Sequence, residues 1–302
     1  MEMKLQLGNE KSVFEAGNLA VKMMKVKKSD ASRPPAELLV VAPEAQGRYP
    51  VVLFCHGYCT QTSWYSQLLC HISSHGYILV APKLYQWLVI CTKDQTKTAS
   101  NVTKWLPEGL EACLAEGVKP DLSKTALMGH SRGGRTAFAL ALGHHHAFKA
   151  LVGLDPVAGP TPPAWVEPRI LSHVPRSLDV GMPVAVVGTG LGSRGKGGGF
   201  IPPLAPDGCN HSEFFNESRP PCCYFMAKEY GHCDVLDDEG MGLGMACRSG
   251  KGCKGKMRRG VGGVVVSFLH AYLGGDCRIL DGVVAAPDVA PILLDPVIYV
   301  KE

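Results

Sequence analysis

Residues 126–136, ALMGHSRGGRT, decide how the chain is interpreted. A short apolar run ends in GHSRG at 129–133, and a segment of helical character, RTAFALALG at 135–143, follows at once. A serine at a sharp strand-to-helix turn is exposed to a substrate, and the turn needs small residues two places before and after it. The stretch therefore predicts a nucleophilic Ser131 between a buried strand at 125–130 and a helix.

Strand-like and helical segments alternate on both sides of this turn. Short apolar runs that end at Gly or Pro are typical of strands buried on both faces of a parallel sheet. Expected strands cover residues 50–57, 77–82, 125–130, 148–156, 182–190 and 222–232, and expected helices cover 62–76, 101–117, 135–143 and 263–275. The alternation predicts an α/β fold with a mostly parallel central sheet and helices on both faces.

The composition indicates one domain. The chain has 302 residues, of which 46% are hydrophobic and 19% charged, so it can bury a large core. No internal repeat and no second core is visible, and a single domain over residues 1–302 is expected. A Gly- and Pro-rich insert at about 190–221 and a loop with six basic residues at about 248–259 interrupt the alternation. Long loops in compact domains are usually functional or disordered.

Charge and hydropathy exclude several classes of protein. The net charge of +4 is far below that of a typical nucleic-acid-binding domain, so no nucleic-acid partner is expected. No apolar run reaches the roughly 18 residues that a membrane span needs. The first 30 residues resemble neither a secretory signal nor a transit peptide, and the sequence has no clear cleavable signal.

Twelve cysteines are a high number for this length. None belongs to a C-x-x-C pair, which weakens a zinc-finger or thioredoxin-like interpretation. Several lie in apolar runs, where a free thiol behaves as a small hydrophobic side chain, and buried reduced thiols are the main expectation. The alternative is a disulfide or metal site formed by the later cysteines with His211 and His232; a metal-binding module would use Cys222, Cys223, His232 and Cys233.

Asp155 is the expected acid partner of Ser131. Enzymes with a serine at such a turn place the acid and the base later in the chain, in the order Ser, Asp or Glu, His. Asp155 follows the next apolar strand, where an acid would hold the imidazole of the base. Asp179 and Asp207 compete less well, and the strand at 182–190 ends without a carboxylate. The alternative makes Asp155 a turn residue.

His232 is the expected base. It follows the last strand-like run in a Gly-His step that is expected to turn into solvent. There it would accept the proton of Ser131 and pass it to the leaving alcohol. His211 in the insert and His270 in a predicted helix compete less well. His56 precedes the serine, which is the wrong order for the base, and is expected to be structural.

Two backbone amides are expected to form an oxyanion hole. One belongs to Arg132, the residue after the nucleophile. The other belongs to Tyr58, in the loop after the first clear strand, where Gly57 allows a close approach of the chain.

Together these segments resemble plant chlorophyllases. LFCHGYCTQTSWYSQLLCHISSHGYILVAPKLY, MGHSRGG, LDPVAG and YGHCDVLDD occur in the same order as in that family, and the likeness covers roughly residues 20–275. It is weakest at both ends, in the insert and in the basic loop. The resemblance implies an α/β-hydrolase fold and a serine esterase that cleaves the ester between the chlorophyll macrocycle and phytol through an acyl-enzyme.

The resemblance also implies the site and its setting. Position by position, Ser131 is the nucleophile, Asp155 the acid and His232 the base. No cofactor is required, because the magnesium ion belongs to the substrate. Chlorophyll and related phytylated pigments are the implied partners, in the chloroplast or another plant intracellular compartment.

A long isoprenoid alcohol needs an apolar slot, in which each buried CH₂ contributes about 0.8 kcal/mol. Phe200, Ile201, Phe214 and Phe215 of the insert, with Gly57 beside the serine, are candidates to line or cover it; the alternative is that they hold a loop in place. The basic loop at 248–259 offers contact with pigment carboxylates or a membrane surface by charge, against the alternative of a solvated flexible loop.

Other function classes stay open. A general carboxylesterase or a lipase-like hydrolase of other hydrophobic esters would share the three residues and differ in pocket shape. A pigment- or lipid-binding protein on an inactive hydrolase scaffold is disfavoured by the complete set of Ser131, Asp155 and His232.

Overall fold

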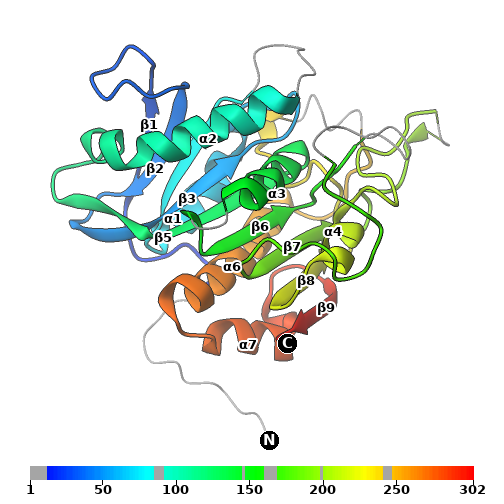
Figure 1. Cartoon of the computed structure of the whole chain (residues 1–302). Coiled ribbons are helices and arrows are strands. Elements are labelled where there is room, and N and C mark those ends of the chain that lie inside the picture. The colour runs from blue at the N-terminus through cyan, green and yellow to red at the C-terminus, as the bar shows by residue number, and fades with distance from the viewer. Residues whose placement is uncertain (1–11, 85–91, 145–146, 160–168, 198–199, 241–246) are drawn as a thin grey trace, which may run out of the picture.

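A computed structural model describes residues 12–84, 92–144, 147–159, 169–197, 200–240 and 247–302. Within these ranges nine strands form one sheet in the spatial order β1-β2-β4-β3-β5-β6-β7-β8-β9 (Figure 1). The strands are β1 (Val21–Val26), β2 (Leu38–Pro43), β3 (Gly47–Cys55), β4 (Ile78–Pro82), β5 (Val118–His130), β6 (Ala150–Leu154), β7 (Val184–Thr189), β8 (Cys222–Ala227) and β9 (Leu294–Val300).

The central strands, from β4 to β8 in the spatial order, are parallel, and β1, β2 and β9 add antiparallel pairs at the two edges. The chain direction across the sheet reverses at β3, which lies between β4 and β5. Open α/β sheets bind ligands outside the carboxyl ends of the strands at such a reversal. The loop after β3 and the turn after β5 meet at this point.

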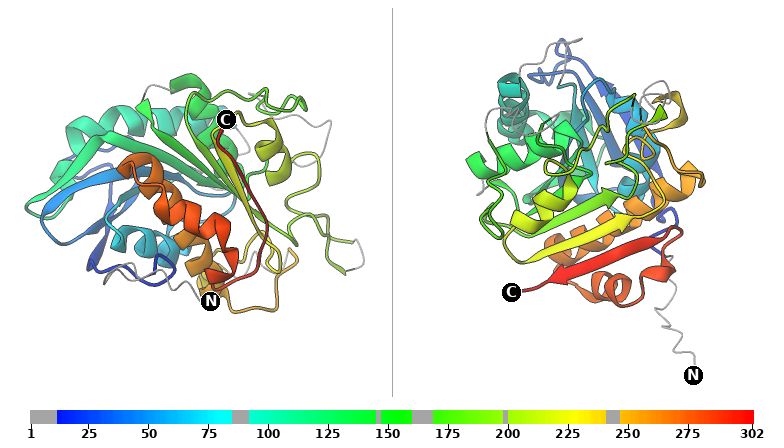
Figure 2. Two further views of the ribbon diagram at one scale, coloured as in Figure 1. Left: turned by 90° about the horizontal axis from the view of Figure 1, so that it is seen from below. Right: turned by 90° about the vertical axis from the view of Figure 1, so that its right-hand side faces the viewer.

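Helices cover both faces of the sheet (Figure 2). On one face lie α1 (Ser66–Ser74), α6 (Lys254–Gly274) and α7 (Arg278–Ala285), and on the other α2 (Thr92–Gly109), α3 (Arg132–His144) and α4 (His211–Glu217). Short 3₁₀ helices cover Thr62–Tyr65, Glu111–Cys113, Asp238–Gly240 and Pro287–Val289. Strand residues alternate between the two apolar cores, because successive side chains of a strand point to opposite faces. The predicted α/β fold with helices on both faces is confirmed.

Three antiparallel strands were not predicted: the edge strands β1 and β9, and β2, LLVVAP, which is buried inside the sheet. β1, VKMMKV, carries two lysines and exposes three of its six residues, and β9, LDPVIYV, contains a proline. Lysine and proline are typical of edge strands, where one side of the ladder needs no partner. These residues interrupt the apolar runs from which the parallel strands are predicted.

Several predicted boundaries are wrong. The helix expected at 101–117 is α2, which begins at Thr92 and ends at Gly109, with Pro107 in its last turn. The strand expected at 222–232 ends at Ala227. The insert at 190–221 contains α4, whose N-cap Asn210 accepts a hydrogen bond from an amide in the first turn. α6 begins at Lys254, inside the expected basic loop.

The helices of the described ranges include none that is both long and apolar enough to cross a bilayer.

Candidate active site

Ser131 lies at the sharp turn between β5 and α3. Its φ is +56°, a left-handed value that is uncommon for a residue with a side chain. Its N–H donates to the carbonyl of Leu154 at 3.0 Å, which ties the turn to β6. A Cβ on Gly133 would lie 2.0 Å from the carbonyl oxygen of Cys55, and one on Gly129 would lie 2.3 Å from that of Gly133. The two flanking glycines are therefore required by the close packing of the turn.

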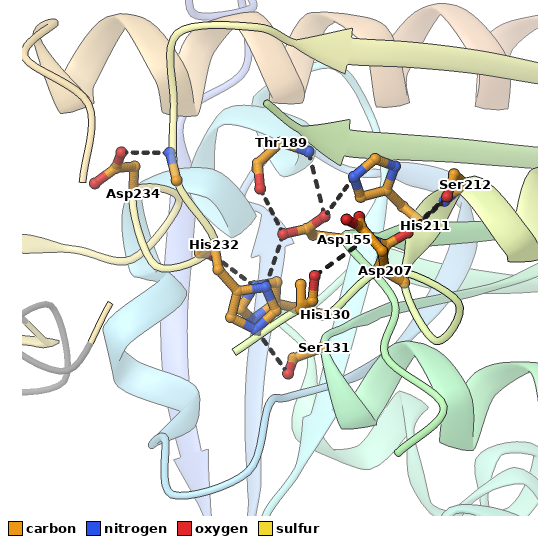
Figure 3. A network of polar contacts seen from close by, with 12 residues as sticks. His130, Ser131, Asp155, Thr189, Asp207, His211, Ser212, His232 and Asp234 are labelled. Atoms are coloured by element: carbon orange, nitrogen blue, oxygen red, sulfur yellow. Dashed lines mark hydrogen bonds and ion pairs between the residues drawn. The ribbon is translucent and has the colours of Figure 1, made fainter. Parts of the chain in front are cut away.

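Ser131, His232 and Asp155 form one hydrogen-bonded chain (Figure 3). Oγ of Ser131 lies 2.8 Å from Nε2 of His232, and Nδ1 of His232 lies 2.7 Å from Oδ2 of Asp155. The three residues follow β5, β6 and β8 at the carboxyl edge of the sheet. This geometry lets the hydroxyl proton pass to the imidazole while the carboxylate holds the second ring nitrogen.

Asp155 is held from its far side by Thr189 and His211. The Thr189 amide donates to Oδ1 at 3.2 Å and its hydroxyl to Oδ2 at 2.6 Å. Nε2 of His211 lies 3.6 Å from Oδ1. Burial acts to raise the pKa of Asp155, but the charge of His211, the hydrogen bond and charge of His232, and the Thr189 hydroxyl together lower it to about 2. The carboxylate is therefore ionised at every physiological pH.

These two partners of the acid were not predicted from the sequence. The strand at 182–190 was read only for a carboxylate, whereas its end carries Thr189, a short donor side chain at the position next to Asp155. His211 was considered as a base and as part of a metal site, but not as a partner of the acid. A Gly-Thr-Gly end of a strand beside the expected acid was the available signal.

His232 is 3% exposed, so the expectation that its Gly-His step turns into solvent is wrong. The carboxylate of Asp234 accepts the amides of Gly231 and Gly250, both at 2.7 Å, and the hydroxyl of Ser249. These bonds join the loop after β8 to the segment before α6. The loop is thereby drawn inward, which holds the imidazole at Ser131.

The loop after β3 lies directly beside the serine. A Cβ on Gly57 would lie 3.3 Å from Cβ of Ser131. The Gly57 amide donates to the hydroxyl of Tyr65 at 3.0 Å and is therefore already engaged. The guanidinium of Arg132 lies 4.5 Å from the ring centroid of Tyr58. The two expected oxyanion residues are therefore in contact beside the serine.

His56 shapes this loop from behind. Its Nε2 accepts the amide of Leu84 at 3.0 Å, and its Nδ1–H donates to the carbonyl of Gly57 at 2.9 Å. Burial lowers the pKa of His56 to about 4, and the ring is neutral. These contacts agree with a structural role.

Phe214 and Phe215 do not lie where a substrate slot was expected. Both are buried in the core: Phe214 contacts Phe138 with ring centroids 4.7 Å apart, and Phe215 stacks on Tyr224 at 5.0 Å. The expectation failed because the segment that contains them is helix α4, which turns its apolar side onto the sheet.

Phe200 and Ile201 lie instead on the surface, with 95% and 37% of their areas exposed. The backbones of Lys196 and Ile201 pair across the loop at 3.0 and 3.2 Å. Leu204 is also 37% exposed. The apolar residues of this loop therefore face outward rather than into a closed slot.

From Lys254 on, the basic stretch at 248–259 is helical rather than a flexible solvated loop, and three of the four cations there form ion pairs. The pairs are Lys254–Asp234 at 3.5 Å, Arg258–Asp238 at 3.4 Å and Arg259–Glu15 at 2.6 Å.

The alternative metal site at Cys222, Cys223, His232 and Cys233 does not converge. Cys222 and Cys223 are adjacent on β8 and belong to the cores on opposite faces of the sheet. His232 is engaged with Ser131 and Asp155. The eleven cysteines of the described ranges are all free thiols, and six of them are buried.

Another cluster, His173, Glu213 and Glu217, has ligand atoms close enough together for a metal ion. Its central group is already occupied, because the carboxylate of Glu217 accepts the amides of Ser172 and His173, both at 2.7 Å. This cluster holds the turn at 172–173 against α4.

The geometry agrees with comparisons with known proteins. A family model described as Chlorophyllase matches residues 9–301. Chlorophyllase-1 of Arabidopsis thaliana is 42% identical over 94% of this chain and 91% of its own length, and Chlorophyllase-2 of the same plant is 46% identical over 82% and 80%. A protein of Citrus unshiu named Chlorophyllase-1, chloroplastic, is 39% identical over 95% and 88%. The chain belongs to the chlorophyllase family of carboxylic ester hydrolases.

Proposed function

We propose that the chain hydrolyses the phytyl ester of chlorophyll to chlorophyllide and phytol, with Ser131 as nucleophile, His232 as base and Asp155 as acid. The observation that carries the proposal is the unbroken hydrogen-bond chain through these three residues. Family membership supports the substrate.

In the first step His232 Nε2 takes the hydroxyl proton of Ser131, and Oγ forms a bond to the ester carbonyl carbon. The carbonyl oxygen becomes an oxyanion, which accepts hydrogen bonds from the amides of Tyr58 and Arg132. Losing one such donor costs about 3 kcal/mol of transition-state stabilisation. Asp155 stabilises the imidazolium that forms.

In the second step the carbon–oxygen bond to phytol breaks, and the imidazolium of His232 gives its proton to the leaving alkoxide. The chlorophyllide acyl group remains on Ser131. A water molecule then loses a proton to His232 and attacks the acyl carbon, which releases chlorophyllide and restores the serine hydroxyl.

The test compares purified protein and its Ser131→Ala variant on chlorophyll in detergent, with chlorophyllide and phytol measured by chromatography. Turnover should fall on the order of 10⁶-fold, because the triad acts as a unit. His232→Ala should be similarly severe and Asp155→Asn somewhat less so. Substantial turnover by Ser131→Ala would exclude this mechanism.

The same protein is assayed on a short p-nitrophenyl ester, which distinguishes a chlorophyllase from a general carboxylesterase. A catalytic efficiency for chlorophyll well above that for the short ester supports the proposal. Hydrolysis of the short ester without chlorophyllide release would assign a general carboxylesterase instead.

The proposal includes the chloroplast as the compartment and a peripheral contact with its membranes. The name of the Citrus relative supports the compartment. The exposed Phe200 and Ile201, on a loop that also carries Arg194 and Lys196, support contact with an anionic lipid surface.

A further inference from the structure

Two buried side chains outside the triad, Tyr65 and His130, connect its parts. Tyr65 ends the 3₁₀ helix before α1, and His130 is the last residue of β5, next to the nucleophile. They are 0% and 1% exposed, and the Tyr65 hydroxyl lies 2.8 Å from Nδ1 of His130. A buried polar pair beside a catalytic residue needs an explanation of where each proton goes.

The partners fix those protons. Nε2 of His130 lies 2.9 Å from the carbonyl oxygen of His232, which can only accept, so Nε2 carries the hydrogen. Burial, followed by the charge of His232, lowers the pKa of His130 to about 3, and the ring is neutral with a single N–H. Nδ1 must then accept from the hydroxyl of Tyr65, whose pKa is raised by burial. The oxygen of Tyr65 accepts the amide of Gly57.

The result is a relay with one direction: Gly57 N–H to the Tyr65 oxygen, Tyr65 O–H to His130 Nδ1, and His130 Nε2–H to the His232 carbonyl. It joins the loop after β3, the turn after β5 and the loop after β8. The space is tight, because a Cβ on Gly57 would lie 3.1 Å from both Nδ1 of His130 and the Tyr65 hydroxyl. The rings of His130 and His232 lie 4.7 Å apart at 33°.

We propose that Tyr65 and His130 are positioning residues that hold the backbone of the base loop and of the oxyanion loop in register with Ser131. This inference rests on the proposed function of the triad. The relay makes no contact with the hydroxyl of Ser131, so it acts through His232 and Gly57. It also engages the Gly57 amide, which leaves the Tyr58 amide to face the oxyanion.

The test replaces His130 by glutamine or by asparagine, whose side-chain amides lie at different distances from the backbone. In His130→Gln the side-chain nitrogen can occupy the place of Nε2 and donate to the His232 carbonyl. In His130→Asn the side chain is one carbon shorter and its amide reaches only the place of Nδ1. Both replacements are neutral and polar, and the bond to the base loop is kept in His130→Gln only; the thermal midpoints record the additional core packing that the shorter Asn loses.

We expect His130→Asn to lower kcat about 30- to 100-fold with KM unchanged, because a misplacement of about 1 Å costs on the order of 100-fold. His130→Gln should stay within about 5-fold of the parent, since it restores the bond to the carbonyl. Tyr65→Phe should lower kcat about 10-fold, and adding it to His130→Asn should cause little further loss, because residues of one network are not additive.

Tyr272→Phe is the matched control. It breaks another Tyr hydroxyl contact, with Tyr299 at 2.7 Å, in the part of the fold formed by α6 and β9. Its kcat should equal that of the parent. Thermal midpoints of all variants separate a change of stability from a change of kcat.

The rate at which a fluorophosphonate probe labels Ser131 gives a second readout that does not depend on the pigment. Slow labelling of His130→Asn beside fast labelling of His130→Gln supports the relay. Equal kcat or equal labelling for the two variants overturns it, as does a loss of kcat that only follows the thermal midpoint. If the probe did not label Ser131 in the parent protein, both the proposed function and the relay would be wrong. Normal labelling of Ser131 without release of chlorophyllide would exclude only chlorophyll as the substrate.

Discussion

At the scale of single residues, Ser131 and Asp155 of the site both have an unusual backbone conformation. Their φ angles are +56° and +40°, in the left-handed region that favours glycine. Such conformations cost of order 1–3 kcal/mol each and persist where the surroundings enforce them. Hydrogen bonds from both backbone amides do this here: Ser131 donates to Leu154 at 3.0 Å and Asp155 to Val187 at 2.6 Å. The strain orients the two side chains toward His232.

The pKa of Asp155 makes a prediction about stability against acid. Its folded value, about 2, lies below the ordinary 3.8, so the unfolded chain binds the proton first. The resulting stabilisation is present above pH 4 and is lost as the pH falls toward 2; it is on the order of 2 kcal/mol. The free energy of unfolding, measured by urea titration, should therefore fall less steeply below pH 4 for Asp155→Asn than for the parent protein. Parallel curves for the parent and the variant between pH 5 and 2.5 would contradict the assignment.

At the scale of elements, the parallel strands β3 to β8 and the glycine-flanked turn were predictable, because each rests on a local pattern, whereas β2 was missed although its sequence, LLVVAP, is an apolar run of the same kind. Ser131, Asp155 and His232 were chosen by chain order and strand ends, and the fold brings them together. Thr189, His211 and the relay were not predictable, because their contacts depend on how side chains from separate loops are oriented. α4 was missed because glycine and proline dominate the insert that contains it.

The loop after β8 provides the prediction at this scale. Asp234 accepts two amides and a hydroxyl from the segments on either side of it, and hydrogen bonds to a charged group contribute about 1.5–3 kcal/mol each. Asp234→Asn leaves one acceptor oxygen and no charge. It should lower the thermal midpoint by several degrees and kcat by about 10-fold or more, because His232 is two residues away. Calorimetry and turnover on chlorophyll measure both effects.

Asp179→Asn serves as the control for that change. Asp179 pairs with Arg219 at 2.8 Å, and both side chains are more than half exposed. An exposed pair contributes about 0–1 kcal/mol, so both the midpoint and kcat should stay close to the parent values. If Asp234→Asn behaved like this control, the loop would be held by other contacts.

At the scale of the whole molecule, the active site and the exposed apolar loop belong to one edge of the sheet. The loop at 190–205 leaves the end of β7, beside Asp155, and projects from the body of the fold (Figure 1). Two backbone hydrogen bonds hold the base of this loop. The Leu191 amide donates to the carbonyl of Tyr230 at 3.0 Å, and the Ala205 amide donates to the carbonyl of Gly192 at 3.2 Å. The base of the loop therefore lies beside Asp155, since a Cβ on Gly192 would lie 2.9 Å from its carboxylate, while Phe200 is exposed.

Replacing Phe200 and Ile201 together by serine should weaken binding to phosphatidylglycerol vesicles at least 10-fold, since burying one such side chain contributes about 1.5–3 kcal/mol. Turnover of chlorophyll embedded in those vesicles should fall with it, while turnover of detergent-dispersed chlorophyll stays unchanged because the triad is untouched. Val289→Ser with Leu293→Ser removes apolar side chains that are 57% and 48% exposed between α7 and β9, and should alter neither quantity. Equal vesicle binding by the two double variants would show that the loop at 190–205 does not contact lipid, and a loss of turnover in detergent would place Phe200 and Ile201 in substrate binding instead.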